Sequence, residues 1–192
     1  MTGLPIALDE VLPDYDFRSR HGRTVAAEPE ALWWAVERYR LDRDGSLLMR
    51  SLFRLRGLAV PRGTLRDALD GSRFTLVAER PGEEIVAATT GRFWAIRERA
   101  NMEAPDDLDA FLAFDRPGWA KAAVCIRVEP RDDGATNLVT ETRVQCVDHG
   151  ARRRFAVYWM LINVFSGWIR RDMLEGIASL AAHAPQREEL MQ

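Results

Sequence analysis

The stretch RRRFAVYWMLINVFSGWIRR, residues 152 to 171, is the most apolar part of the chain and has arginines at both ends. As a helix, its apolar part would span about 22 Å, which is short of the roughly 30 Å hydrocarbon layer of a membrane. It also contains Asn163, Ser166 and Gly167. We therefore expect no membrane span here and conclude that the protein itself must bury this stretch.

Apolar residues continue beyond this stretch at helical spacing. One stripe recurs every three or four positions, through Phe155, Trp159, Ile162, Ser166, Ile169, Met173, Ile177 and Leu180. A second apolar set lies beside it and consists of Tyr158, Leu161, Phe165 and Trp168. Asp148 is placed to cap the helix start, and Pro185 marks its end. The pattern predicts a long C-terminal helix whose wide apolar arc is covered on more than one side.

The chain before this helix shows strand and helix patterns in turn. We expect a strand at 15–25, a helix in AEPEALWWAVERY, and a second helix at 45–58 through Leu48, Leu52, Leu55 and Leu58. A short turn of helix is expected from Thr64 to Leu69. A hairpin then turns at Pro81-Gly82, and a longer hairpin occupies GWAKAAVCIRVEPRDDGATNLVTETRVQCVD. The acidic segment 100–117 connects the hairpins, with a short strand expected at Ala110–Phe114.

The longer hairpin can be placed in register by centring its turn at Asp133. Four pairs then share one face: Val128–Leu138, Ile126–Thr140, Val124–Thr142 and Ala122–Val144. This face is apolar apart from its threonines, so it should meet the core. The other face carries Lys121, Cys125, Arg127, Glu141, Arg143 and Gln145 and is expected to face water. Cys125 and Cys146 fall on opposite faces, so we expect no disulfide between them.

The order of elements predicts an α+β fold in one domain that spans residues 1–192, with a core at about 14–183. A curved antiparallel sheet would wrap around the long C-terminal helix, with two short helices following the first strand. The apolar face of the sheet and the wide arc of the helix would bury each other. Any space left between them would form a pocket.

This layout resembles the helix-grip fold of the START-like, or SRPBCC, superfamily, which includes the polyketide cyclase/dehydrase-like proteins. The blocks EEIVAATTGRFW, GWAKAAVCIRVEP, LVTETRVQCVD and ARRRFAVYWMLINVFSGWIRRDML are similar to recurring blocks of a group of uncharacterised bacterial members. The resemblance covers about 14–182. It implies a hydrophobic cavity between sheet and helix that binds apolar or amphipathic ligands, with catalysis in a minority of members. It carries over no catalytic motif.

Charge and composition exclude several partners. The net charge is −2, and of the 27 basic residues only Lys121 is a lysine. The arginines alternate with acidic residues, so we expect no nucleic-acid surface. The N-terminal segment has early acids and no basic, apolar leader pattern, and the two cysteines have no framework spacing. These features favour a cytoplasmic protein.

The ligand-pocket candidates are the aromatic and small polar residues on the elements expected to face each other. They are Trp94, Trp119, Val124, Thr140, Thr142, Phe155, Tyr158, Trp159, Ile162, Asn163 and Ser166. The three histidines, His21, His149 and His183, have no metal-ligand spacing, so we expect no metal and no cofactor. Glu141 could act as a pocket acid or base, but the register favours pairing with Arg127 or Arg143 on the other face.

Three functions remain open from the sequence. The first is binding of an apolar or amphipathic small molecule between sheet and helix. The second is a cyclase- or dehydratase-like enzyme that uses a pocket acid or base. The third is a homodimeric interaction module whose seam would include Tyr158, Leu161 and Trp168.

Overall fold

The structure is a computed structural model that describes residues 7–47, 50–51, 60, 62–70, 73–95 and 101–184. Its described strands are β1 (Phe17–Val25), β2 (Thr75–Arg80), β3 (Glu84–Gly91), β4 (Met102–Glu103), β5 (Ala120–Pro130) and β6 (Thr136–Cys146). Its described helices are α1 (Ala7–Val11), α2 (Pro29–Arg38), α3 (Leu41–Asp44), α5 (Leu65–Leu69), α6 (Leu108–Leu112) and α7 (His149–Ala181).

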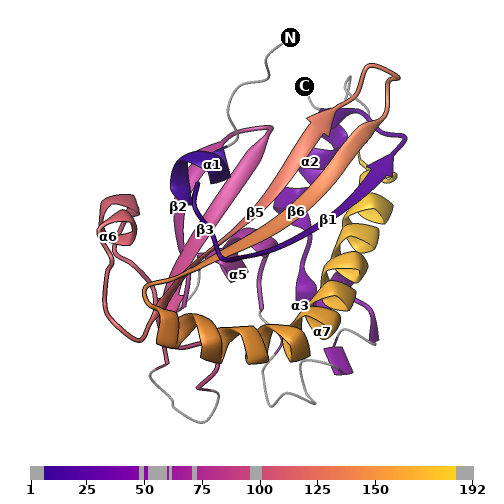
Figure 1. Cartoon of the computed structure of the whole chain (residues 1–192). Helices are drawn as coiled ribbons and strands as arrows, with labels where there is room; N and C mark the ends of the chain where they lie inside the picture. The colour runs from indigo at the N-terminus through magenta and orange to yellow at the C-terminus, as the bar shows by residue number, and fades with distance from the viewer. Residues whose placement is uncertain are drawn as a thin grey trace.

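The six strands form one open antiparallel sheet in the order β1-β6-β5-β3-β2, and β4 pairs with β3. Helices α2 and α3 follow β1, and the 33-residue α7 ends the described chain. Figure 1 shows α7 running across one end of the sheet and then rising beside β1. The predicted α+β helix-grip arrangement is confirmed. Most of the second predicted helix, including Leu48, Leu52, Leu55 and Leu58, lies outside the described residues.

Several local predictions are confirmed with their physical causes. Asp148 caps α7, because its side chain accepts a hydrogen bond from the Ala151 backbone N–H. Thr64 and Asp67 form a reciprocal capping box at the start of α5. Gly82 adopts a φ of 84° in the β2–β3 turn, a conformation that glycine reaches without steric cost.

The segment expected to be a short strand at Ala110–Phe114 is helical instead. Helix α6 covers Leu108–Leu112, and the Asp107 carboxylate accepts a 2.8 Å hydrogen bond from the Ala110 backbone N–H. Phe111 is fully buried against the sheet. The strand prediction was wrong because Asp107 acts as a helix cap. A single helical turn is also too short to show a helical period in the sequence.

The register of the β5–β6 hairpin is confirmed at all four predicted pairs. One face, which we call the inner face, carries Ile126, Val128 and Leu138 and packs against α2 and α7. Cys125 lies on the opposite, outer face, and both cysteines are free. The strict alternation of side chains along a strand therefore divides the sheet into two distinct environments.

The outer face was expected to meet water, and this prediction was wrong. Cys125 and Glu141 are fully buried there, and Arg143 is 4% exposed. Helix α1 covers this face together with α6, and the Ala7 backbone N–H donates a 2.7 Å hydrogen bond to Glu84. The sequence did not reveal this cover because α1 is only five residues long.

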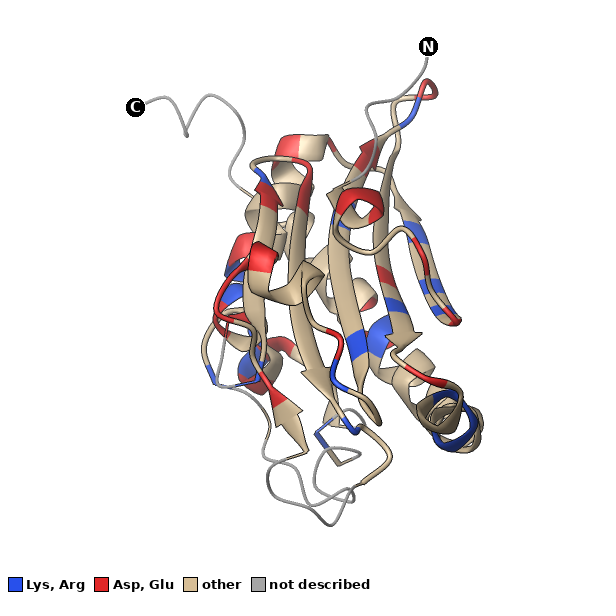
Figure 2. Cartoon of the chain, turned by 60° about the vertical axis from the view of Figure 1, so that its left-hand side comes forward, with Lys and Arg blue, Asp and Glu red and all other residues tan. Residues whose placement is uncertain are grey.

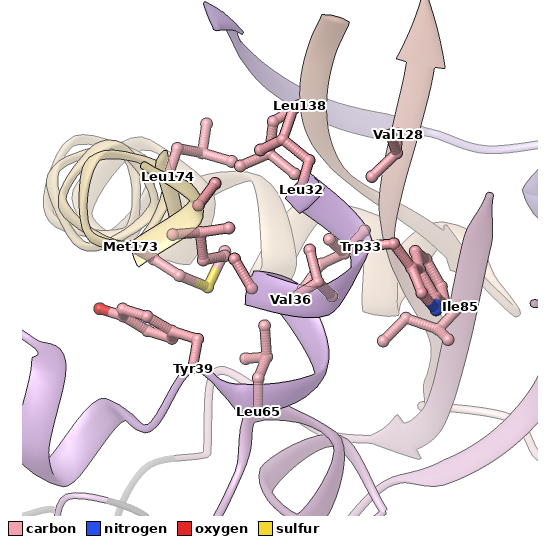
Figure 3. Packing of buried hydrophobic residues seen from close by; sticks show 14 of the residues in the cluster. Leu32, Trp33, Val36, Tyr39, Leu65, Ile85, Val128, Leu138, Met173 and Leu174 are labelled. Carbon is pink, nitrogen blue, oxygen red and sulfur yellow. The ribbon is translucent and has the colours of Figure 1, made fainter. Parts of the chain in front are cut away.

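Helix α7 has two halves with different surroundings. In the second half, Met173 and Leu174 pack against Val36 and Tyr39 of the α2 segment, as Figure 3 shows. In the first half, Phe155 is buried. The second apolar set was expected to be covered, and this was wrong, because Leu161 is 69% and Trp168 is 47% exposed. The helix changes direction along its length (Figure 1), and the Ser166-Gly167 pair near its middle is of a kind that permits a bend.

Gly176 of α7 packs directly against Tyr39, the residue that follows α2. A Cβ atom at this position would lie 2.6 Å from Cε2 of the buried Tyr39 ring. We expect Gly176→Ala to lower the free energy of unfolding by about 1–3 kcal/mol, because overpacking outweighs the helix propensity of alanine. Urea denaturation would measure this change. The exposed Ser179→Ala on the same helix is the control and should not destabilise, and a Gly176→Ala protein as stable as wild type would contradict the packing.

Candidate ligand-binding site

Two apolar clusters cover the inner face of the sheet, one at each end. The first joins α2 and the second half of α7 to Ile126, Val128 and Leu138. The second gathers Phe155, Ala120, Ala122 and Val144 with partly buried aromatic rings. The cross-strand pair Val124–Thr142 lies between the clusters, belongs to neither, and is partly exposed. The inner face is therefore incompletely packed near its centre, although β5 and β6 are central strands.

The β1 strand brings polar side chains beside this pair. Ser19 lies opposite Thr142, and His21 lies opposite Thr140, on the same face. The Ser19 hydroxyl and Nε2 of His21 are 3.2 Å apart. The Thr142 hydroxyl oxygen is buried and has no hydrogen-bond partner within the described chain. A buried hydroxyl in this state is a free site for a polar group of a ligand or for water.

Helix α7 contacts these polar side chains from the side opposite the strands. A Cβ atom on Gly167 would lie 3.3 Å from Cε1 of His21, so the helix backbone and the imidazole are in close contact. One turn later, Arg170 Nε donates a 3.2 Å hydrogen bond to the Ser166 hydroxyl. We call Ser19, His21, Thr142, Ser166 and Arg170 the inner polar band.

Burial and charge shift the titration of two members of this band. The pKa of His21 lies below its ordinary value of 6.5, first because of burial and then because the positive charges of Arg170 and Arg171 oppose its protonation. Burial lowers the pKa of Arg170 to about 10. His21 is therefore neutral near neutral pH, and Arg170 remains positively charged.

An aromatic group lies at one end of the band. The Phe155 ring is 5.5 Å from Trp159, 5.7 Å from Tyr158 and 6.2 Å from Trp94 between ring centroids. Phe17 of β1 completes the group at 4.9 Å from Phe155. The inner face thus offers an apolar, aromatic wall directly beside polar side chains, an arrangement suited to an amphipathic molecule.

The structure places most of the sequence-predicted pocket residues on this inner side. The residues that it brings together there are Trp94, Val124, Thr140, Thr142, Phe155, Tyr158, Trp159 and Ser166. Ile162 is partly exposed on α7. Trp119 lies elsewhere: its ring is 5.9 Å from that of Phe114 at a tilt of 57°, and the guanidinium of Arg116 lies over it at 4.4 Å. Asn163 points to solvent and is exposed. Whether the inner residues bind a ligand stays a prediction.

Sequence reasoning missed Ser19, His21 and Arg170 as site residues. Ser19 and His21 share one face of the strand expected at 15–25, but the neighbour of that strand is unknown without the sheet order. Arg170 belongs to an arginine pair at the end of an apolar run, which is typical of a surface position. Its distance of one helical turn from Ser166 was the signal that could have placed it on the inner stripe.

Glu141 lies on the outer face and does not approach the inner band. Its carboxylate accepts hydrogen bonds from Arg18 at 2.8 and 2.9 Å and from Arg143 at 2.8 Å. The predicted pairing with Arg143 is confirmed, whereas Arg127 pairs with Glu84 at 3.5 Å and Glu129 at 2.6 Å. Figure 2 shows basic and acidic segments interspersed over the fold, as this pairing requires. Glu141 therefore stabilises the fold and is not placed to act in an inner pocket.

A separate cleft of about 730 Å³ lies between α2 and the β2–β3 turn. Its lining includes Trp33, Trp34, Arg80 and Arg127 together with five glutamates: Glu30, Glu37, Glu83, Glu84 and Glu129. None of the predicted pocket residues lines it. The excess of carboxylates makes it a poor site for an anionic ligand.

The described residues contain no group of three or more histidine, cysteine, aspartate or glutamate side chains placed to hold a metal ion. No helix in the described part of the chain has the length and apolarity to cross a lipid bilayer.

Comparison with known proteins finds distant structural similarity and no family for this chain. No family model matches the sequence, and no curated protein matches it. Among solved structures, the hypothetical protein jhp0584 from Helicobacter pylori is similar, with 9% identity, a TM-score of 0.39, and coverage of 94% of this chain and 97% of that one. Ara h 8.0201 is similar at 12% identity and a TM-score of 0.27, covering 87% of this chain and 98% of that one.

The outer-face network should make stability depend on pH through Glu141. Burial by itself would raise the pKa of Glu141, but the hydrogen bonds from Arg18 and Arg143 outweigh it and hold the pKa below 4.5. The stabilisation is therefore complete above pH 4.5 and is lost as the pH falls through the lowered value. We expect Glu141→Gln to lower the free energy of unfolding by about 3 kcal/mol at neutral pH, because the buried carboxylate that accepts hydrogen bonds from Arg18 and the buried Arg143 is replaced by a neutral amide.

Urea denaturation of both proteins between neutral pH and pH 3 would measure this dependence. The difference between wild type and Glu141→Gln should shrink at the acid end. Asp133→Asn, which removes the partner of Arg131 in an exposed turn, is the matched control and should change stability little. A pH-independent difference for Glu141→Gln would refute the role of its charge.

Proposed function

We propose that this protein binds a hydrophobic or amphipathic small molecule between the inner face of the sheet and α7, as a cytoplasmic member of the START-like superfamily. The observation that carries the proposal is the partly exposed Val124–Thr142 pair between two well-packed clusters. Ile126 on one side of Val124 is 1% exposed, and Ala122 on the other is 8% exposed. A partly exposed pair between two packed clusters is the place on this face where a ligand can reach the sheet.

The residues around this opening support an amphipathic ligand in particular. Phe155, Trp159 and Tyr158 supply apolar contact area. Ser19 and Thr142 supply hydroxyl groups on the adjacent strands. The resemblance of the sequence blocks to START-like proteins implies the same location for a ligand.

The enzyme alternative now depends on His21. A cyclase- or dehydratase-like reaction needs an acid or base beside the substrate, and Glu141 is on the wrong face of the sheet to supply it. His21 is neutral near neutral pH because its pKa is lowered by burial and by the nearby arginines, so it could accept a proton. Simple binding remains the first proposal because it requires no such transfer.

Native mass spectrometry before and after denaturation tests the binding proposal, followed by titration with the neutral dye Nile red. We expect a small apolar molecule or the dye to be retained by the native protein. Val124→Phe should weaken dye binding by about tenfold, because the larger ring would occupy the space beside the partly exposed Val124–Thr142 pair. Arg153→Phe introduces the same ring at an exposed position of α7 and is the control. A native protein that retains no molecule and binds no dye would end this proposal.

The homodimer alternative is favoured by a different observation. The first half of α7 leaves Met160 70%, Leu161 69%, Val157 59%, Val164 57% and Phe165 41% exposed. Such a row of apolar side chains is unusual on a protein surface without a partner. The arginines at both ends of the row would repel each other in an antiparallel pairing, which places this alternative second.

Light scattering would decide between monomer and dimer. If a second copy covers the row, the mass should be that of a dimer and should fall to that of a monomer in Leu161→Glu. Arg153→Glu, an exposed change of charge outside the apolar row, should leave a dimer intact. A monomeric wild type at high concentration would remove the alternative.

A further inference from the structure

Within the described part of the chain, the guanidinium of Arg170 has no negatively charged partner. Its Nε donates to the neutral Ser166 hydroxyl at 3.2 Å. Its Nη1 is buried and makes no hydrogen bond within the described chain. Burying a charge without a counter-charge costs free energy, and proteins accept this cost mainly where the charge has a use.

The nearest carboxylates on the same helix serve other groups. Asp172 accepts a 3.1 Å hydrogen bond from the Ser46 backbone N–H. Glu175 forms an ion pair with Arg23 of β1. The two acidic residues, two and five positions after Arg170, therefore do not neutralise it.

Neighbouring side chains connect Arg170 to the partly exposed Val124–Thr142 pair of the sheet. His21, whose protonation is opposed by the charge of Arg170, contacts the α7 backbone at Gly167. His21 is 3.2 Å from the Ser19 hydroxyl, and Ser19 lies opposite Thr142. A positive charge and the Thr142 hydroxyl, which has no hydrogen-bond partner among the described residues, thus belong to one polar band beside the partly exposed Val124.

We propose that the inner polar band binds the carboxylate of an amphipathic ligand, with Arg170 as the counter-charge and the hydroxyls of Thr142 and Ser19 as further donors. This inference rests on the proposed function and names its ligand class, an apolar molecule that bears one carboxylate. The apolar part would lie along the aromatic group at Phe155.

The donor set favours a carboxylate over a more highly charged head group. A carboxylate has two oxygens and one negative charge, which suit one free edge of a guanidinium and neighbouring hydroxyl donors. A phosphate would bring additional charge and oxygens. Nearby His21 is held neutral because its pKa is lowered by burial and by Arg170 and Arg171, so it would add no second positive charge near neutral pH.

Displacement of Nile red by decanoate and by decanol tests this inference, because the two probes differ only in the head group. The affinity of wild type for decanoate should be at least about tenfold higher than its affinity for decanol, as expected for a charge-assisted hydrogen bond. Arg170→Met should lose this preference and keep its affinity for decanol. Arg170→Lys keeps the charge without the planar group and should retain part of the preference. Arg153→Met removes an exposed charge from the same helix and should bind both probes as wild type does.

Stability separates a ligand-binding role of Arg170 from a structural one. Without ligand, Arg170→Met should melt at a temperature no lower than wild type, because it removes a charge that has no partner. A lower melting temperature would overturn the inference. Equal binding of decanoate and decanol by wild type would also overturn it, while the proposed function would stand. Binding of neither probe nor dye would remove both.

Discussion

The pairing of β5 with β6 is the constraint on which the rest of this structure depends. Side chains alternate across the sheet, so one register decides which residues meet α2 and α7 and which meet α1. It places Val124 and Thr142 on the inner side and Glu141 and Arg143 on the outer side. A shift of one residue would exchange the apolar inner face with the charged outer face, and neither layer of helices could then pack.

The two faces solve the problem of burial in different ways. The inner face buries apolar side chains at both ends and leaves a polar band at its centre, where Ser19, Thr142 and Arg170 meet. On the outer face, the buried Glu141 is neutralised by the buried Arg143 and the partly exposed Arg18. Arg143 has its counter-charges in Glu141 and Asp9, whereas Arg170 has none among the residues that the structure describes.

Much of the fold could be predicted because its signals are local or repeat over many residues. The caps at Asp148 and Thr64 and the stripe from Phe155 to Leu180 depend on neighbours within a few turns. The β5–β6 register follows from a turn and an alternating pattern. The candidate site was predicted only in part: Val124 and Thr142 came from that register, whereas Ser19 and His21 required knowledge that β1 pairs with β6.

The sequence by itself determined the long helix, the hairpin register and the inner position of Thr140 and Thr142, because each follows from periodicity within one element or one turn. Only the tertiary structure decided that α1 covers the outer face, that Leu161 and Trp168 stay exposed, and that Arg170 lies near His21 with no counter-charge among the described residues. Burial and ion pairing depend on segments far apart in the chain, and no local pattern states which of them will meet.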